Sequence, residues 1–208
     1  MKKIIFILLI SLFFFSCKKK QTIHITAKNA ATGEPYPGLT YYVVTYKNVL
    51  KPYGGTKSKT VATGTLDENG EAYVTERLSK NNGHGVRVVE PENSCYNKNI
   101  QLYFSDETNF KAEFEFAECA YLKQNITNIN CIDVNDYMVL YSDNQIHSLG
   151  NIPWEFYGCD GYIQSHYSSV PEGEYFYKWE VTRNNITNVF YDTIYLSKGE
   201  YRIHEINY

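Results

Sequence analysis

The sequence predicts an all-β protein made of two tandem β-sandwiches. Segments in which apolar and polar residues alternate recur along the 208 residues, and such alternation is typical of half-buried strands. Clusters of Gly, Pro, Asn and Asp separate these segments at the spacing expected of turns between short strands. No window shows the periodicity of an amphipathic helix, and the 16% share of aromatic residues argues against disorder.

The N-terminal residues indicate export from the cytoplasm. Two lysines precede the apolar run 4–15, which Ser16 and Cys17 follow. That run is shorter than the ~20 residues that a membrane-spanning helix needs. A basic start, a short apolar core and a small residue before the cut are typical of a secretory signal peptide. We therefore expect residues 1–16 to be a removable leader.

The cysteine at this place resembles that of the bacterial lipoprotein signal. The resemblance implies that Cys17 is diacylated and that residues 17–21 form a lipidated tether, with two acyl chains giving stable anchoring. Lys18, in place of aspartate, resembles the sorting pattern for the outer membrane of Gram-negative bacteria. Whether the protein faces the periplasm or the cell surface stays open. Phe14 stands where such signals usually carry leucine, so an ordinary leader with an incidental cysteine is the alternative.

Residues 22–117 are expected to form the first sandwich. In its first strand Ile23, Ile25 and Ala27 share one face, which predicts a half-buried strand. β-Branched and aromatic residues, which favour strands, predict the others in the ranges 39–47, 85–90, 100–104 and 110–114.

The last two of these segments are predicted to form a hairpin. A register that pairs Ile100 with Phe114 places all of their apolar residues on one face. The same register puts Cys95 opposite Cys119. Cross-strand Cα distances of about 4.5–5.5 Å fall within the range that a disulfide tolerates, so we expect these two cysteines to be bonded.

Residues 118–208 are expected to form the second sandwich, because the strand pattern begins again. In its clearest strand Tyr175, Tyr177, Trp179 and Val181 share one face. The size of each domain suits a seven-stranded immunoglobulin-like sandwich. The other strands of the second sandwich are expected in the ranges 120–126, 137–141, 154–157, 189–196 and 201–206.

Two stretches of the first domain, 32–38 (TGEPYPG) and 65–72 (TLDENGEA), carry a family resemblance. They resemble the transthyretin-like, or carboxypeptidase-regulatory-like, β-sandwich of bacterial surface proteins. The prolines fix φ in the first stretch, and Asn69-Gly70 favours a tight hairpin turn in the second. The resemblance covers residues 22–90 and implies a non-catalytic module.

Four of the five cysteines remain once Cys17 is assigned to lipid. A secreted context favours disulfides, and beside the first pair we expect Cys131 bonded to Cys159 by exclusion. No C-x-x-C or H-x-x-x-H spacing is present, so a zinc site is the weaker alternative. The acidic stretch 133–136 is expected to serve a turn rather than calcium. No metal or cofactor is expected.

Nothing in the sequence predicts catalysis. There is no G-x-S-x-G, no H-E-x-x-H and no phosphate-binding glycine loop. The histidines are scattered, and His24 and His204 alternate with apolar neighbours, which predicts solvent-facing positions. We expect a non-enzyme. A hydrolase with a site built from distant residues is the third of the functions weighed.

The excess of tyrosine suggests a hypothesis about binding. An exposed coplanar pair among Trp154, Tyr157 and Tyr162 would favour stacking on sugar rings. The alternative is that these rings fill the periphery of small β cores. Separately, Asp192-Thr193-Ile194 resembles a sequon for bacterial O-glycosylation, with Thr193 as the acceptor.

Charge and hydropathy exclude several classes of protein. The chain has 20 Lys and Arg against 23 Asp and Glu, a balance that gives no support for nucleic-acid binding. A mean hydropathy of -0.41 excludes a polytopic membrane protein. Without the five lysines of leader and tether, 15 basic residues face 23 acidic ones, a formal charge of -8. We expect a lipid-anchored outer-membrane or surface protein that serves as a binding or assembly module for a protein or glycan. The alternative is a glycan-binding component of polysaccharide capture.

Overall fold

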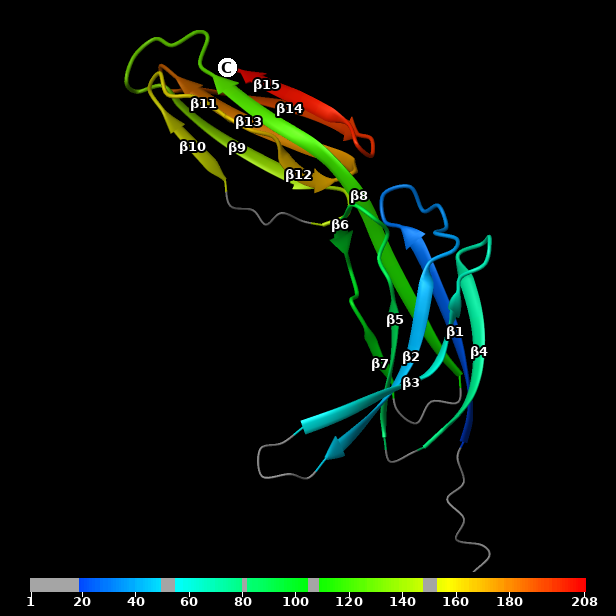
Figure 1. Ribbon diagram of the computed structural model, residues 1–208. Helices are drawn as coiled ribbons and strands as arrows, with labels where there is room; N and C mark the ends of the chain where they lie inside the picture. Colours follow the sequence, from blue (N-terminus) through cyan, green and yellow to red (C-terminus); the bar gives the residue numbers. More distant parts are fainter. Residues whose placement is uncertain (1–18, 50–54, 80–81, 105–108, 148–152) are drawn as a thin grey trace, which may run out of the picture. The chain divides into compact units, whose positions relative to one another are not determined.

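Figure 1 shows the computed structural model of the chain, which describes residues 19–49, 55–79, 82–104, 109–147 and 153–208. These residues form strands joined by turns, with no helix among them. The predicted all-β fold class is therefore confirmed. Cys17 lies outside the described residues.

The strands form three hydrogen-bonded sheets. The first has the order β3-β2-β5-β7 and the second β10-β9-β13-β14, whereas the third follows β11-β8-β1-β4, with β6, β12 and β15 also paired to β8. In chain order the strands are β1 (Lys19–Asn29), β2 (Thr40–Val49), β3 (Gly55–Thr65), β4 (Glu71–Leu78), β5 (Gly83–Val88), β6 (Ser94–Asn97), β7 (Leu102–Phe104), β8 (Asn109–Thr127), β9 (Tyr137–Asn144), β10 (Trp154–Tyr157), β11 (Tyr162–Ile163), β12 (Ser168–Pro171), β13 (Gly173–Arg183), β14 (Ile186–Leu196) and β15 (Tyr201–Asn207).

The chain divides into two compact units. Unit 1 contains the described residues up to Ala27 together with Pro35–Val89 and Asn99–Phe114. Unit 2 contains Lys28–Glu34, Glu90–Lys98 and Glu115–Tyr208. Strands β1 and β8 contribute residues to both units, so the units are not two consecutive stretches of sequence.

Unit 1 has two sheets, each with one buried face. In β1, Ile23 and Ile25 are fully buried and Ala27 is nearly so, as the alternation predicts. The opposite sheet contributes Val43 from β2 and Val86 from β5, which are also fully buried. The remaining buried apolar residues of this unit are Leu66, Val74, Leu78, Val88, Phe104, Ala112 and Phe114.

The predicted hairpin of 100–104 with 110–114 is wrong. Strand β7 pairs with β5, whereas β8 is the neighbour of β1 in the other sheet. Phe104 and Phe110 still meet, with ring centroids 4.4 Å apart, although their strands belong to different sheets. Alternation aligns apolar residues equally well in both arrangements, so it does not distinguish hydrogen-bonded neighbours from strands that face each other across a core.

Unit 2 is also built from two sheets around one core. Strand β13 contributes the face that the sequence predicts, because Tyr175, Tyr177 and Val181 are buried and Trp179 packs against them. The core cluster contains in addition Ala120, Leu122, Ile126, Met138, Leu140, Leu196, Ile206 and Tyr208.

Strand β15 corrects the prediction for one histidine. It runs parallel to β8 and buries Ile206, and Tyr208, which follows the strand, is buried as well. His204 has the same parity as these two residues and is only 6% exposed, whereas Ile203 is 48% exposed. The predicted solvent-facing position of His204 is therefore wrong. Its side chain points to the same face as Ile206 and Tyr208, which are the buried apolar residues.

Candidate functional site

Both disulfides that the sequence predicts are present in unit 2. The first joins Cys95 of β6 to Cys119 of β8, with Cα atoms 4.9 Å apart. The two strands pair antiparallel with an irregularity between Ser94 and Tyr96. The predicted register, which placed the two cysteines directly opposite each other, is therefore not the one found, although the bond is formed.

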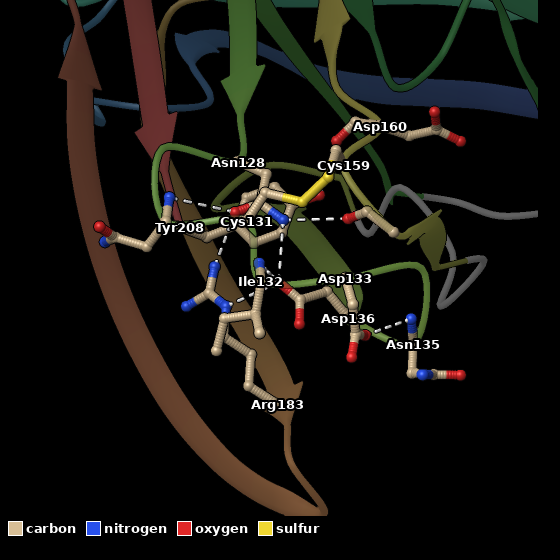
Figure 2. Close-up of polar contacts among 12 residues, drawn as sticks. Asn128, Cys131, Ile132, Asp133, Asn135, Asp136, Cys159, Asp160, Arg183 and Tyr208 are labelled. Atoms are coloured by element: carbon tan, nitrogen blue, oxygen red, sulfur yellow. Dashed lines mark hydrogen bonds and ion pairs between the residues drawn. A yellow bond between two sulfur atoms is a disulfide. The ribbon is translucent and has the colours of Figure 1, made fainter.

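The second disulfide lies beside a network of polar side chains (Figure 2). Cys131 and Cys159 join the loop after β8 to the loop after β10, with Cα atoms 5.3 Å apart. The carboxylate of Asp136 is the centre of the network. Its Oδ2 accepts hydrogen bonds from the amide of Ile132 and from Nε of Arg183, each at 3.0 Å.

Asn128 connects the two loops (Figure 2). Its Oδ1 accepts a hydrogen bond from the Arg183 guanidinium at 2.8 Å, and its Nδ2 donates to Asp136 Oδ2 at 3.3 Å and to the Gly158 carbonyl at 2.9 Å. The Gly158 amide donates to the Asp136 carbonyl at 2.6 Å. Gly158 has a φ of 60°, a conformation that glycine adopts without strain.

Asp136 is a buried charge with an ion-pair partner. Its side chain is 2% exposed and that of Arg183 is 21% exposed. Burial by itself raises the pKa of Asp136, but hydrogen bonds from the Ile132 amide, Arg183 and Asn128 outweigh it, so the pKa lies below its ordinary value. Because protein groups hold the carboxylate, the network positions the two loops and offers no free acid or base.

The three candidate sugar-stacking residues do not form one flat platform. Trp154, Tyr157 and Tyr162 are 44%, 57% and 39% exposed. The rings of Trp154 and Tyr162 meet edge to face, with centroids 5.4 Å apart and planes at 88°. Tyr157 instead packs beside Tyr137 at 4.8 Å and donates a hydrogen bond to Glu155 at 2.6 Å. This hydrogen bond, together with burial, raises the pKa of Tyr157 to about 12.

A second aromatic surface, which sequence reasoning missed, lies on the outer face of the β10-β9-β13-β14 sheet. Phe176, Tyr191 and Tyr195 are 42%, 73% and 41% exposed. Thr193 is opposite Phe176 in the register of β13 with β14 and lies on the same face. A signal was present in the sequence: β14 carries apolar residues at both odd and even positions, so one set must remain outside a two-layered sandwich.

Thr193 is exposed on this face. Its amide donates to Oδ1 of Asp192 at 2.8 Å. The other carboxylate oxygen, Oδ2, lies 2.9 Å from Nε2 of His204. Asp192 is thus held by the buried His204, while the Thr193 side chain lies on the outer face.

Unit 1 has a shallow groove of about 260 Å³ on the outer side of β1. The stacked rings of His24 and Tyr73, with centroids 4.2 Å apart, form one wall. His24 Nε2 lies 3.2 Å from Oε2 of Glu71, so one histidine–carboxylate pair borders the groove. The lining residues are Thr22, His24, Tyr73, Asn109, Phe110 and Lys111.

Asp133 serves a turn, as expected, and Asp67 does the same, whereas Asp136 is the buried centre of the polar network. Asp133 Oδ1 accepts the amide of Asn135 at 2.7 Å, and Asp67 Oδ1 accepts that of Asn69 at 2.9 Å. Among the described residues, no group of three or more His, Cys, Asp or Glu side chains is placed to hold a metal ion. In the same part of the chain, no helix is long and apolar enough to cross a membrane.

A scan against protein-family models and a search of the curated proteins both find no match. Similar solved structures include the TIE protein of Bacillus anthracis, with a TM-score of 0.35 and 14% identity over 91% of this chain. This chain spans 34% of the length of that one.

Two pilins are similar over nearly their whole length. The minor pilin GBS52 of Streptococcus agalactiae has a TM-score of 0.35 and 11% identity, covering 90% of this chain and 94% of the pilin. The shaft pilin SpaA of Lactobacillus rhamnosus GG has a TM-score of 0.33 and 7% identity, covering 91% and 96%. At these values the likeness carries no argument about function.

Proposed function

We propose that this chain is a bacterial lipoprotein, held in the outer membrane by an acylated Cys17, whose β-sandwiches act as a non-catalytic binding or assembly module. The first sandwich is a transthyretin-like module in this proposal and the second is immunoglobulin-like. The leader and the cysteine that follows it support the anchor. The exposed aromatic face of unit 2 supports the binding role.

That face is the observation that carries the proposal. Phe176, Tyr191 and Tyr195 expose between 41% and 73% of their surface on one side of a sheet. Lys178 lies over the ring of Tyr141 at 5.2 Å, which adds a cation among the aromatic rings. Contiguous exposed aromatic residues mark surfaces that bind macromolecules, and a sheet face is too flat to enclose a small molecule.

Replacing the proposed acylation site tests the anchor. In cells labelled with a radioactive fatty acid, the wild-type chain should carry label and sediment with membranes. Cys17→Ser should carry none and should appear in the soluble fraction, because the chain then lacks its acyl chains. Membrane association of an unlabelled Cys17→Ser chain would contradict the proposal.

The binding role is tested by polar substitution on the exposed face. The wild-type chain, extracted in mild detergent, should migrate on native gels in a complex larger than its own mass. Phe176→Ser with Tyr195→Ser should shift it to the free form. The matched control is Tyr73→Ser with Tyr103→Ser, two residues of unit 1 that are 69% and 68% exposed. If both double variants migrate alike on native gels, the aromatic face of unit 2 is not the binding surface.

A glycan ligand is the second candidate function. The observation in its favour is that Trp154 and Tyr162 are exposed side by side, although their planes stand at 88°, so each ring would contact sugar separately and not as one platform. Migration of the protein in gels that contain polysaccharide would test it. Retardation that Trp154→Ala with Tyr162→Ala abolishes, and Tyr73→Ala does not, would support sugar binding, whereas an unretarded wild-type chain would exclude the polysaccharide used.

An O-linked glycan on Thr193 is an alternative use of the same face, because Thr193 lies opposite Phe176 and a glycan there would cover the exposed rings. Mass spectrometry of protein from its native host should then show a glycan mass that disappears in Thr193→Val. Thr187 is the matched control, since it is exposed on the same strand but follows no aspartate. An unmodified Thr193 peptide would refute this part.

A further inference from the structure

Strand β14 (Ile186–Leu196) forms one edge of its sheet. It pairs with β13 through eleven residues, from Ile186 to Leu196, with no shift of register. It is the last strand in the order β10-β9-β13-β14. Within the described part of the chain, its other side meets no further strand, so a row of backbone N–H and C=O groups faces outward.

This edge lacks the protection that the other edges have. Natural sheets shield edge strands by shortness, by charged side chains, by proline or by bulges. Strands β7, β10 and β11 have four residues or fewer. The longer edges carry charges, with Lys57 and Lys59 on β3, Glu71 and Arg77 on β4, and Arg202 and Glu205 on β15. Strand β14 is long and regular, contains no Pro, Lys or Arg, and has Asp192 as its one charged residue.

Both faces of β14 expose apolar side chains. Val189 and Tyr191 are 45% and 73% exposed on adjacent odd positions, and Ile186 and Phe190 are 65% and 44% exposed on even positions. The charge of Asp192 is engaged by His204 at 2.9 Å. A strand that pairs with this edge must therefore offer apolar side chains on both of its own faces, and β14 itself does so.

We propose that two copies of this chain pair through β14, antiparallel about Tyr191, so that their sheets join into one. In this register Tyr191 faces Tyr191 of the second copy, and all eleven residues of the strand are paired. Asp192 faces Phe190 of the second copy, so the two aspartates avoid direct opposition, which destabilises like charges. The contact closes on itself by two-fold symmetry. A second copy of this chain is thus the partner for the proposed assembly role. The pairing rests on the proposed function only for its biological purpose, because its geometry follows from β14 alone.

Cysteine cross-linking of the full chain in intact cells tests the register. Paired Cα atoms of neighbouring strands lie about 4.5–5.5 Å apart, within disulfide range. Tyr191→Cys should therefore give a covalent dimer on non-reducing gels. Val134→Cys, at a loop position that is 84% exposed, should not. Thr187→Cys and Tyr195→Cys face each other in this register, so they should cross-link when co-expressed and not singly.

A charge placed on the two-fold axis tests the energetics. Tyr191→Lys puts two ammonium groups opposite each other and should raise the dimer dissociation constant by about tenfold or more in sedimentation. Val134→Lys adds the same charge elsewhere and should leave the constant unchanged. Circular dichroism checks that both variants are folded.

The inference and the proposed function fail separately. A membrane-bound chain in which Tyr191→Cys gives no dimer, or gives a conjugate with another protein, overturns the pairing and leaves the anchor intact. A chain released to the soluble fraction that still cross-links through Tyr191→Cys overturns the anchor and supports the pairing. Equal cross-linking of Val134→Cys also overturns the pairing, because the dimer would then be non-specific.

Discussion

Arg183 and Asp136 form an ion pair whose two partners lie 47 residues apart in the sequence, with Nε and Oδ2 separated by 3.0 Å. Arg183 is the last residue of β13, and Asp136 lies just before β9. The pair therefore joins a strand of the unit 2 core to the loop that contains Cys131, which a disulfide links to Cys159 (Figure 2). The guanidinium also lies 5.7 Å from the ring centroid of Tyr208. One cation therefore fixes the loop and the C-terminal residue together.

Removing the cation should destabilise the fold. Arg183→Met leaves the Asp136 carboxylate buried without its counter-charge, which is costly in proteins. We expect the melting temperature to fall by several degrees. Arg202→Met is the matched control, because that arginine pairs with Glu200 at the surface, where ion pairs contribute little. Equal melting temperatures for the two variants would show that the buried pair has no special role.

The same carboxylate should make stability depend on pH. The folded-state pKa of Asp136 is lowered from its ordinary 3.8, so the unfolded chain binds the proton first as the pH falls. The stabilisation is complete above pH 3.8 and is lost as the pH falls through the lowered folded-state pKa. Urea unfolding of the wild type and of Asp136→Asn across this range measures it. We expect the wild type to lose more stability, and parallel curves would contradict the assignment.

Local alternation predicted the strands and their buried faces. Ile23 and Ile25 are buried together, as are Tyr175 and Tyr177, because a strand places every second side chain on one face irrespective of its partners. Both cysteine pairs were predicted and are formed, but the register that predicted Cys95–Cys119 belonged to a hairpin that is not present, and Cys131–Cys159 was assigned by exclusion. That the ranges 22–117 and 118–208 each fold as a separate domain stays a prediction.

Partnership between strands could not be predicted in the same way. Phe104 and Phe110 meet across two sheets, and their alternation fits a hairpin equally well. Trp154 and Tyr157 are three positions apart on one strand, so the pleat sends their rings to opposite faces. The Arg183–Asp136 pair joins distant segments, and no spacing in the sequence signals such a contact.

Loss of the second disulfide should weaken unit 2. Cys131→Ala with Cys159→Ala opens a loop with a sequence separation of 28, which increases the entropy of the unfolded chain. We expect the free energy of unfolding to fall by about 2–4 kcal/mol. Urea unfolding measures this, and the comparison variant is Cys95→Ala with Cys119→Ala, whose separation of 24 predicts a similar loss. An unchanged midpoint in the first variant would show that the polar network alone holds the loops.

The side chain of Asn29 should be among the most sensitive polar positions of unit 2. Its Nδ2 donates to Glu172 Oε1 at 2.6 Å, and its Oδ1 accepts the amides of Ala31 at 2.8 Å and Thr32 at 3.1 Å. Asn29 and Glu172 are 7% and 4% exposed. The asparagine thus shapes the turn after β1 and satisfies a buried carboxylate at the same time.

Asn29→Ala should lower the free energy of unfolding by about 2–4 kcal/mol, because it removes three hydrogen bonds and leaves the buried Glu172 Oε1 with the Glu118 amide, at 3.2 Å, as its donor. Asn207→Ala, at an exposed strand position, should change it by less than about 0.5 kcal/mol. Combining Asn29→Ala with Glu172→Leu should cost less than the sum of the two single losses, since the buried carboxylate is then absent. Strictly additive losses in urea unfolding would mean that the two side chains stabilise the unit independently.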